Sequence, residues 1–359
     1  MLIRSVVLFF LIQNITTLDA FNIIEKPLCS VYTPNSILNR KQDYWPLFIG
    51  ERARYSTCTG VTWFHQDYLA VLNLFGRKIN TYAFLPAQNQ FYPLQELDNS
   101  QGTELTHSEN LVVSPDGSLL ALCSDNPNAG IKLYDIDLKS HLINPKPIFT
   151  LQTPQLIHNV RFTPDGRYLA AVGEDNDAAV CVYKVLKKSN NVSLELVHQQ
   201  ENHLKELGTK GINFTQSGKL VVVVHSAKAR LTPEKSPSGL VLAYTFNTDN
   251  GSLGQIVGYT LSGHPGFGYE DVALADNDTV LICSDQNNDM LTIYPFDPVT
   301  GKIDSNYRTL FGPETQLDFP HGIGLSRDGN YLAVSNYGDD KCSVYRLESS
   351  TTTSTNHSQ

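Results

Sequence analysis

Hydrophobic and polar positions alternate in the same order six times along this chain. In the last repeat a short apolar strand runs from His321 into the polar turn at Asp328-Gly329, and two further apolar strands follow at residues 331–335 and 343–347. Asp-Gly pairs predict tight turns, because Gly takes a positive φ without strain and Asp bonds its own backbone. Similar turns recur at intervals of roughly 50 residues, a period typical of β-propeller blades: Gln66-Asp67, Asp116-Gly117, Asp165-Gly166, Ser217-Gly218 and Asp276-Asn277 or Asn277-Asp278.

The eight positions that lead into each turn predict the innermost strand of each blade. The third position is aliphatic in all six repeats, and the fifth is always large and apolar. Residues two apart on a strand face the same side, so these two positions define its buried face. The third positions are Val61, Leu111, Val160, Ile212, Val272 and Ile323, and the fifth positions are Trp63, Val113, Phe162, Phe214, Leu274 and Leu325.

Further strands follow in every repeat, which predicts an all-β propeller of four-stranded blades. We count six blades, with a seventh, degenerate blade in residues 21–57 as the alternative. The expected second strands are residues 68–74, 119–124, 168–173, 220–225, 280–284 and 331–335, and the clearest fourth strands are 149–151, 195–198, 254–260 and 308–311.

The last repeat ends at about Leu347 without a fourth strand. A ring that buries its final edge must then take a strand from the other end of the chain. Residues 44–49 (YWPLFI) are the expected closing strand. The expected organisation is therefore a signal peptide at 1–20, a closure segment at 21–57, the propeller at 58–347 and a disordered tail at 348–359.

The first twenty residues are typical of a secretory signal. Arg4 precedes an apolar run at residues 6–12, and Ala20 offers a small residue at a cleavage point. The alternative is a first strand or a short buried helix. The run is too short to span a bilayer, so no transmembrane segment is predicted. We expect a secreted or periplasmic protein, with a cytoplasmic one as the alternative.

Composition and charge narrow the classes of partner. The chain of 359 residues is 41% hydrophobic and 18% charged, with a formal net charge of −9. Nucleic acids and anionic membranes bind proteins through patches of Lys and Arg. This chain has no basic cluster longer than Lys187-Lys188, so neither is expected to be its main partner. We expect a monomer whose partner is a small molecule or another protein.

Four of the six cysteines fall on predicted strands. Cys123 and Cys283 are expected to occupy the same second-strand position, in LCSD and ICSD, while Cys181 and Cys342 fall in third strands. Cys is a good small core residue, so these four are expected to be buried thiols. Cys29 and Cys58 lie outside this scheme and could form a disulfide if the protein is exported.

The first position of the repeat carries the candidate chemistry, since no G-x-S-x-G, H-E-x-x-H, paired C-x-x-C or phosphate-loop motif is present. Residues that open the innermost strands should meet at the mouth of the central channel. Neighbouring charges there can shift pKa values for acid–base chemistry; the alternative is a solvated polar mouth. The first positions are Thr59, Glu109, His158, Lys210, Glu270 and His321, and the second positions add Asn110, Asn159 and Asp271.

From this set we take His158, His321 and Glu270 as candidate catalytic residues, and Lys210, Glu109, Asn159 and Arg161 as candidate substrate-binding residues. Arg161 stands at a fourth position, and its planar guanidinium can bind a carboxylate or phosphate bidentately. An ion pair with another blade is the alternative. The Asp-rich turns lack the graded spacing of a calcium loop, so no metal site is predicted.

The last two repeats resemble the lactonase-type propellers, which include 6-phosphogluconolactonases, carboxymuconate cyclases and YVTN-repeat surface proteins. The resemblance rests on residues 290–302 (MLTIYPFDPVTGK), 319–329 (FPHGIGLSRDG) and 332–338 (LAVSNYG) and covers roughly residues 105–347. It implies a lactone hydrolase or cyclase that needs no metal or other cofactor, with its site in the channel. His321 and His158 would be its acid–base residues and Arg161 its anion clamp.

Three features depart from that family pattern: six counted blades instead of seven, the predicted signal peptide, and a long loop at residues 226–239. Two functions therefore stay open. The first is an exported propeller that hydrolyses a small lactone at the channel mouth. The second is a non-enzymatic propeller that binds a protein or another ligand, because one fold serves both roles.

Overall fold

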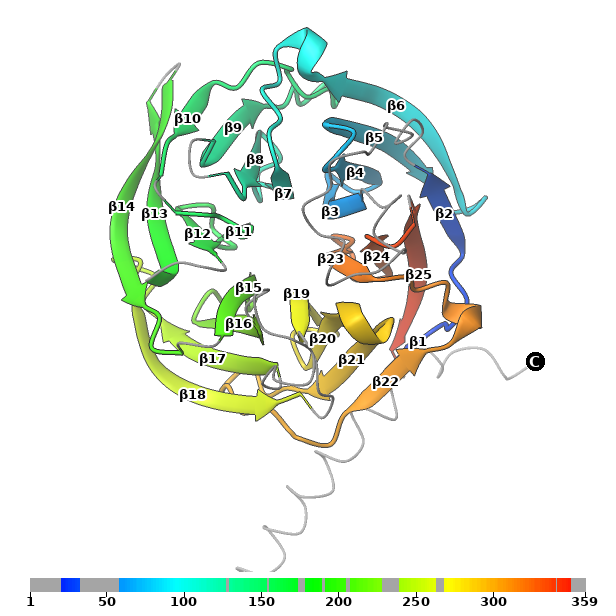
Figure 1. Ribbon diagram of the computed structural model, residues 1–359, viewed down its shortest axis with the longest axis vertical. Helices are drawn as coiled ribbons and strands as arrows, with labels where there is room; N and C mark the ends of the chain where they lie inside the picture. The colour runs from blue at the N-terminus through cyan, green and yellow to red at the C-terminus, as the bar shows by residue number, and fades with distance from the viewer. Residues whose placement is uncertain are drawn as a thin grey trace, which may run out of the picture.

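The chain forms a ring of six β-sheets around a central axis, as Figure 1 shows for this computed structural model. The structure describes residues 21–32, 58–126, 129–153, 155–173, 178–188, 191–204, 207–227, 239–262, 268–339 and 341–349. Within these residues each blade is an antiparallel sheet of four strands or, in the last blade, three strands completed from the N-terminal end. The all-β propeller fold is thus confirmed, with six blades in the described residues.

The strands follow one another outward from the axis in each blade. Blade one holds β3 (Cys58–Phe64), β4 (Tyr68–Asn73), β5 (Lys78–Leu85) and β6 (Gln90–Asp98). Blade two holds β7 (Ser108–Val113), β8 (Leu119–Ser124), β9 (Ile131–Asp135) and β10 (Phe149–Leu151). Blade three holds β11 (Asn159–Phe162), β12 (Tyr168–Val172), β13 (Ala178–Lys188) and β14 (Asn191–Glu201).

The second half of the ring repeats this order. Blade four holds β15 (Leu207–Phe214), β16 (Leu220–Ala227), β17 (Leu240–Phe246) and β18 (Leu253–Leu261). Blade five holds β19 (Tyr269–Ala275), β20 (Val280–Asp285), β21 (Met290–Pro295) and β22 (Arg308–Phe311). Blade six holds β23 (Pro320–Leu325), β24 (Tyr331–Asn336) and β25 (Lys341–Ser349), with β1 (Phe21–Ile23) and β2 (Cys29–Tyr32).

In the part of the chain that the structure describes, helical structure is limited to the 3₁₀ turns η2 (Asn99–Gln101), η4 (Gln286–Asn288) and η5 (Pro313–Thr315). Across the described stretches, no helix has the length and apolar character needed to cross a membrane. The predicted signal peptide at 1–20 lies outside the described residues and stays a prediction.

The repeat pattern places the core between neighbouring blades. All six third-position residues are at most 1% exposed, and Trp63, Phe162, Phe214 and Leu274 from the fifth position are also buried. The turn glycines adopt positive φ as expected, for example 75° at Gly117 and 73° at Gly329. Each blade therefore shares one apolar layer with the next.

Blade six is closed by N-terminal strands, as predicted, but not by the expected segment. β1 pairs with the end of β25 (Phe21↔Ser349, Ile23↔Leu347), and β2 pairs with its start (Cys29↔Val344, Tyr32↔Lys341). Together they occupy the edge that residues 44–49 were expected to fill. Residues 44–49 themselves lie outside the described residues.

The six cysteines, all within the described part of the chain, form no disulfide. Cys29, Cys58 and Cys342 contribute to one apolar cluster between the first and last blades. The proposed equivalence of Cys123 and Cys283 was wrong by one residue, since Cys123 pairs with Asn110 of the second position and Cys283 with Val272 of the third. The turns of blades two and five are equally long, because Leu111 pairs with Leu122 and Val272 with Cys283 at the same third position, so Cys123 lies one residue further along its second strand than Cys283 does.

His225, near the end of β16, gives the fold a testable acid sensitivity. Its ring is 1% exposed, neither nitrogen has a hydrogen-bond partner among the described residues, and burial lowers its pKa to about 4. The unfolded chain then binds more protons than the folded one between about pH 6.5 and about pH 4, so stability falls as the pH drops through this window. Between about pH 7.5 and about pH 5, the free energy of unfolding should therefore fall by about 2 kcal/mol more in the wild type than in His225→Leu.

Urea unfolding of wild type and His225→Leu at the two pH values measures how the free energy of unfolding depends on pH. His203→Leu, at an exposed position, is the matched control and should leave this dependence unchanged. An identical pH dependence in wild type and His225→Leu would contradict the assignment.

Candidate functional site

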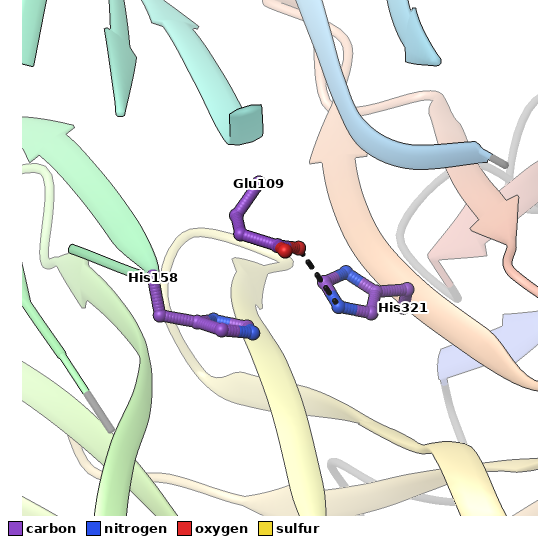
Figure 2. A group of neighbouring side chains, drawn as sticks. All are labelled: Glu109, His158 and His321. Carbon is purple, nitrogen blue, oxygen red and sulfur yellow. Dashed lines mark ion pairs between the residues drawn. The ribbon is translucent and has the colours of Figure 1, made fainter. Parts of the chain in front are cut away.

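Five first-position side chains from five consecutive blades meet at one end of the channel. We call Glu109, His158, Lys210, Glu270 and His321 the channel cluster. Figure 2 shows Glu109, His158 and His321 pointing toward one another from separate blades. They converge because every innermost strand begins at the same end of the ring, so equivalent residues form a circle. The predicted meeting of these five residues is what the structure shows.

Glu270 lies at the centre of the channel cluster. Its Oε2 atom is 3.2 Å from Lys210 Nζ, 3.3 Å from His158 Nε2 and 3.6 Å from His321 Nε2. None of these contacts aligns as a hydrogen bond, so this oxygen has no hydrogen-bond partner among the described residues. His321 Nε2 lies also 3.8 Å from Glu109 Oε2. One ammonium group and two imidazole rings therefore surround a carboxylate oxygen that can still accept a hydrogen bond.

Both histidine rings are fixed by backbone carbonyls. His158 Nδ1 lies 3.1 Å from the carbonyl oxygen of Lys210, and His321 Nδ1 lies 3.1 Å from that of Thr59. A carbonyl can only accept, so each Nδ1 carries the hydrogen and each Nε2 faces the cluster. Thr59, the sixth first-position residue, thus takes part through its backbone.

Burial and neighbouring charges shift the pKa values of the cluster. Burial raises the pKa of Glu109 to about 8 and lowers that of His321 to about 3. Burial and the Lys210 charge oppose protonation of His158, but Glu270 and Glu109 outweigh them, and the pKa of His158 is raised. Burial alone would raise the pKa of Glu270, yet Lys210 and His158 hold it well below its usual range. Glu270 is therefore the charged carboxylate of the cluster at neutral pH.

Arg161 and Asn159 do not join the channel cluster, because both bind Asp271. Arg161 Nη2 lies 3.3 Å from Asp271 Oδ1, and Asn159 Nδ2 donates to the same oxygen at 3.0 Å. Asp271 also accepts from the backbone N–H of Ile323 at 3.0 Å. Arg161 of blade three thus forms an ion pair with another blade, the alternative given in the sequence analysis. In this arrangement its guanidinium is not available to bind an anionic substrate.

The sequence did not single out Tyr337 or the hydroxyls that support the strand openings, and it marked Asp285 only as part of an Asp-rich turn. The Tyr337 ring stacks on that of His321, with centroids 5.8 Å apart. Ser284 Oγ donates to the carbonyl of His321 at 2.6 Å. Burial raises the pKa of Asp285 to about 6. Tyr337 follows the second strand β24, and Ser284 and Asp285 are the last two residues of the second strand β20. Second strands end where first strands begin, so the position of these residues in the repeat could have identified them.

A cavity of about 230 Å³ lies at the turns that follow the innermost strands of blades three and four, at the opposite ends of these strands from the cluster. Its lining includes Asp165, Gln216 and Thr248. It touches no member of the channel cluster.

Comparison with known proteins identifies one family. The sequence profile described as "Lactonase, 7-bladed beta-propeller" matches residues 76–359. An uncharacterized protein of Lactococcus lactis, YwcC, is 23% identical over 234 residues, which are 64% of this chain and 61% of that protein. The chain thus spans less than two thirds of the length of this relative.

Solved structures share the fold. A putative 6-phosphogluconolactonase from Bacteroides uniformis has a TM-score of 0.51 at 17% identity, covering 70% of this chain and 71% of its own. Kuenenia stuttgartiensis hydrazine synthase has the same TM-score at 14% identity, covering 81% of this chain and 96% of its own. Because such different enzymes match equally well, this likeness shows the propeller fold alone.

Proposed function

Because the chain belongs to the lactonase family of β-propellers, we propose that it hydrolyses a small lactone at the channel cluster. One observation carries the proposal: five side chains from five blades meet, with Lys210, His158 and His321 around one oxygen of Glu270 and with Glu109 beside His321. A merely solvated channel mouth would not require basic and acidic groups to converge in this way. The buried cluster supplies the polar groups that a hydrolytic site needs.

Lactone hydrolysis makes two demands on the site. A water oxygen attacks the ring carbonyl carbon, the carbonyl oxygen becomes negatively charged, and the bond from this carbon to the ring oxygen breaks. The proton of the water ends on the freed ring oxygen, and a hydroxy acid leaves. The histidines with Glu109 form the part of the cluster that can activate the water, and Lys210 forms the part that can stabilise the negative oxygen.

The exposure of the cluster indicates the direction of approach. The Lys210 and Glu109 side chains are 11% and 10% exposed, whereas His158, Glu270 and His321 are 4–5% exposed. A substrate would meet Lys210 and Glu109 first, with the histidines at the inner end. This order suits a small polar lactone whose carbonyl oxygen faces the ammonium.

A second function, protein binding, is favoured by the outer strand of blade four. Along β18, Ile256, Tyr259 and Leu261 are 54%, 69% and 61% exposed. Large apolar side chains in a row on an edge strand are typical of a surface that pairs with a partner. This surface lies on the outside of the ring and does not compete with the channel cluster.

Turnover of lactones tests the proposed function. We expect the purified chain to hydrolyse small five- or six-membered lactones, followed by acid release, and Lys210→Met to lower kcat/KM by about 100-fold, as for loss of one oxyanion-stabilising group. Lys187→Met is the control, because Lys187 makes an exposed ion pair with Asp116 far from the cluster. Equal rates in wild type and Lys210→Met, or no turnover of any lactone, would refute the proposal.

A further inference from the structure

We infer that Glu109, His158 and His321 bind a single divalent transition-metal ion, with Zn²⁺ the best match, in the channel cluster. The inference of metal binding depends only on the arrangement of these side chains. A catalytic role for the ion rests on the proposed lactone hydrolysis. The inference departs from the family resemblance, which implied chemistry without a metal.

The spacing of the donor atoms fits a small coordination sphere. One carboxylate oxygen of Glu109 and one ring nitrogen each of His158 and His321 all lie within 4.8 Å of one another. Tetrahedral zinc with bonds of about 2.0–2.1 Å separates its ligand atoms by about 3.3–3.5 Å. The His321–Glu109 distance is 3.8 Å, so small side-chain rotations would complete the set (Figure 2). Two histidines and one glutamate are a known zinc ligand set that leaves a fourth position open.

The histidines are oriented as metal ligands require. Each Nδ1 is fixed by a backbone carbonyl at 3.1 Å, from Lys210 for His158 and from Thr59 for His321. Ligating histidines commonly use their second nitrogen in this way, which fixes the tautomer and directs the Nε2 lone pair at the ion. Two such rings from opposite blades, with centroids 5.1 Å apart, direct both lone pairs into one space.

Glu270 gives an independent reason for a ligand at this place. It is 3% exposed, and its Oε2 lies 3.3 Å and 3.6 Å from the two Nε2 atoms but has no hydrogen bond among the described residues. A buried carboxylate oxygen normally accepts hydrogen bonds. A water in the open coordination position could donate the missing hydrogen bond to Oε2 of Glu270.

A bound ion would displace the protons that the cluster favours on Glu109 and His158. With both carboxylates then ionised and both imidazoles neutral, the cluster and Lys210 sum to −1, and a divalent ion brings the total to +1. Lys210 Nζ lies 3.2 Å from the same Glu270 oxygen that the two histidines approach, so its charge is offset by that carboxylate. Imidazole with carboxylate suits zinc better than magnesium or calcium, which prefer oxygen ligands.

Such an ion would explain how the proposed hydrolase activates water. A zinc-bound water loses its proton near neutral pH, so the metal can supply hydroxide for attack on the lactone carbonyl carbon. The proton that the water loses would end on the ring oxygen that leaves. Lys210 then remains to stabilise the negative carbonyl oxygen.

The test measures metal binding directly on the full chain. Chelator-treated protein is titrated with Zn²⁺ by calorimetry, bound metal is counted by elemental analysis, and Co²⁺ replaces Zn²⁺ to report the coordination through its visible spectrum. We expect one ion per chain, and at least about a 100-fold loss of Zn²⁺ affinity in His158→Ala and in Glu109→Gln. Glu109→Gln keeps the shape of the side chain, so circular dichroism should show an unchanged fold. His198→Ala on β14, outside the cluster, is the matched control.

The outcomes separate this inference from the proposed function. A folded chain that binds no Zn²⁺, or binds it equally well in His158→Ala and Glu109→Gln, overturns the metal site. If lactones are still hydrolysed in excess chelator, the metal inference fails while the proposed function stands. If Zn²⁺ binds as expected but no lactone is hydrolysed, the site stands and the function fails.

Discussion

Asp271→Ala is expected to lower the free energy of unfolding by about 3–5 kcal/mol, the cost of breaking a buried ion pair on one side. Asp271 is 1% exposed and accepts hydrogen bonds from Asn159, Arg161 and the backbone of Ile323. Removing its carboxylate leaves the guanidinium of Arg161, with a side chain only 12% exposed, without its charged partner. Urea denaturation followed by fluorescence measures the loss.

Glu96→Ala is the control for this experiment. Glu96 also pairs with a basic residue, Lys78, at 2.7 Å, but its side chain is 43% exposed. Exposed ion pairs contribute about 0–1 kcal/mol. A loss in Asp271→Ala no larger than that in Glu96→Ala would show that the buried contacts do not stabilise the ring.

Phe21→Ala is the second substitution with a large expected effect, a loss of about 3–5 kcal/mol in the free energy of unfolding. Phe21 is 2% exposed and packs with Leu310, Leu317 and Leu347 in the apolar layer between blades five and six. Its carbonyl oxygen also accepts from the Arg308 guanidinium. A strand of three residues has little else to hold it in place.

Asn22→Ala tests the same strand without touching the core, because Asn22 is exposed between two buried neighbours. We expect it to change the unfolding free energy by less than about 0.5 kcal/mol. Equal midpoints for Phe21→Ala and Asn22→Ala in urea denaturation would mean that β1 does not close the ring.

The repeats made most of the fold predictable. A period-2 pattern that returns six times marks both the buried face and the turn of each innermost strand, and β8, β10 and β22 have the predicted bounds. The closing strands were harder to find, because β1 and β2 contain three and four residues and belong to no repeat. Residues 44–49 have the stronger apolar pattern, but the edge of β25 is already paired.

The candidate site was predictable only where it follows from the repeat. Equivalent strand openings must form a circle, so the meeting of His158, Lys210 and His321 could be expected from their shared position. The partner of Arg161 could not, because Asp271 lies 110 residues away and on a blade that is not its neighbour. Nothing in either repeat marks such a contact.

The contacts of Asp271 link blades across the ring, in addition to the pairing of the N-terminal strands with β25. β1 and β2 join the two ends of the chain along the circumference, whereas Asp271 of blade five holds blade three and blade six at once. A ring closed only by this strand pairing could unfold one blade at a time from the closure. Here a blade released at the closure is still bound through Asp271, so the ring should unfold in one cooperative step.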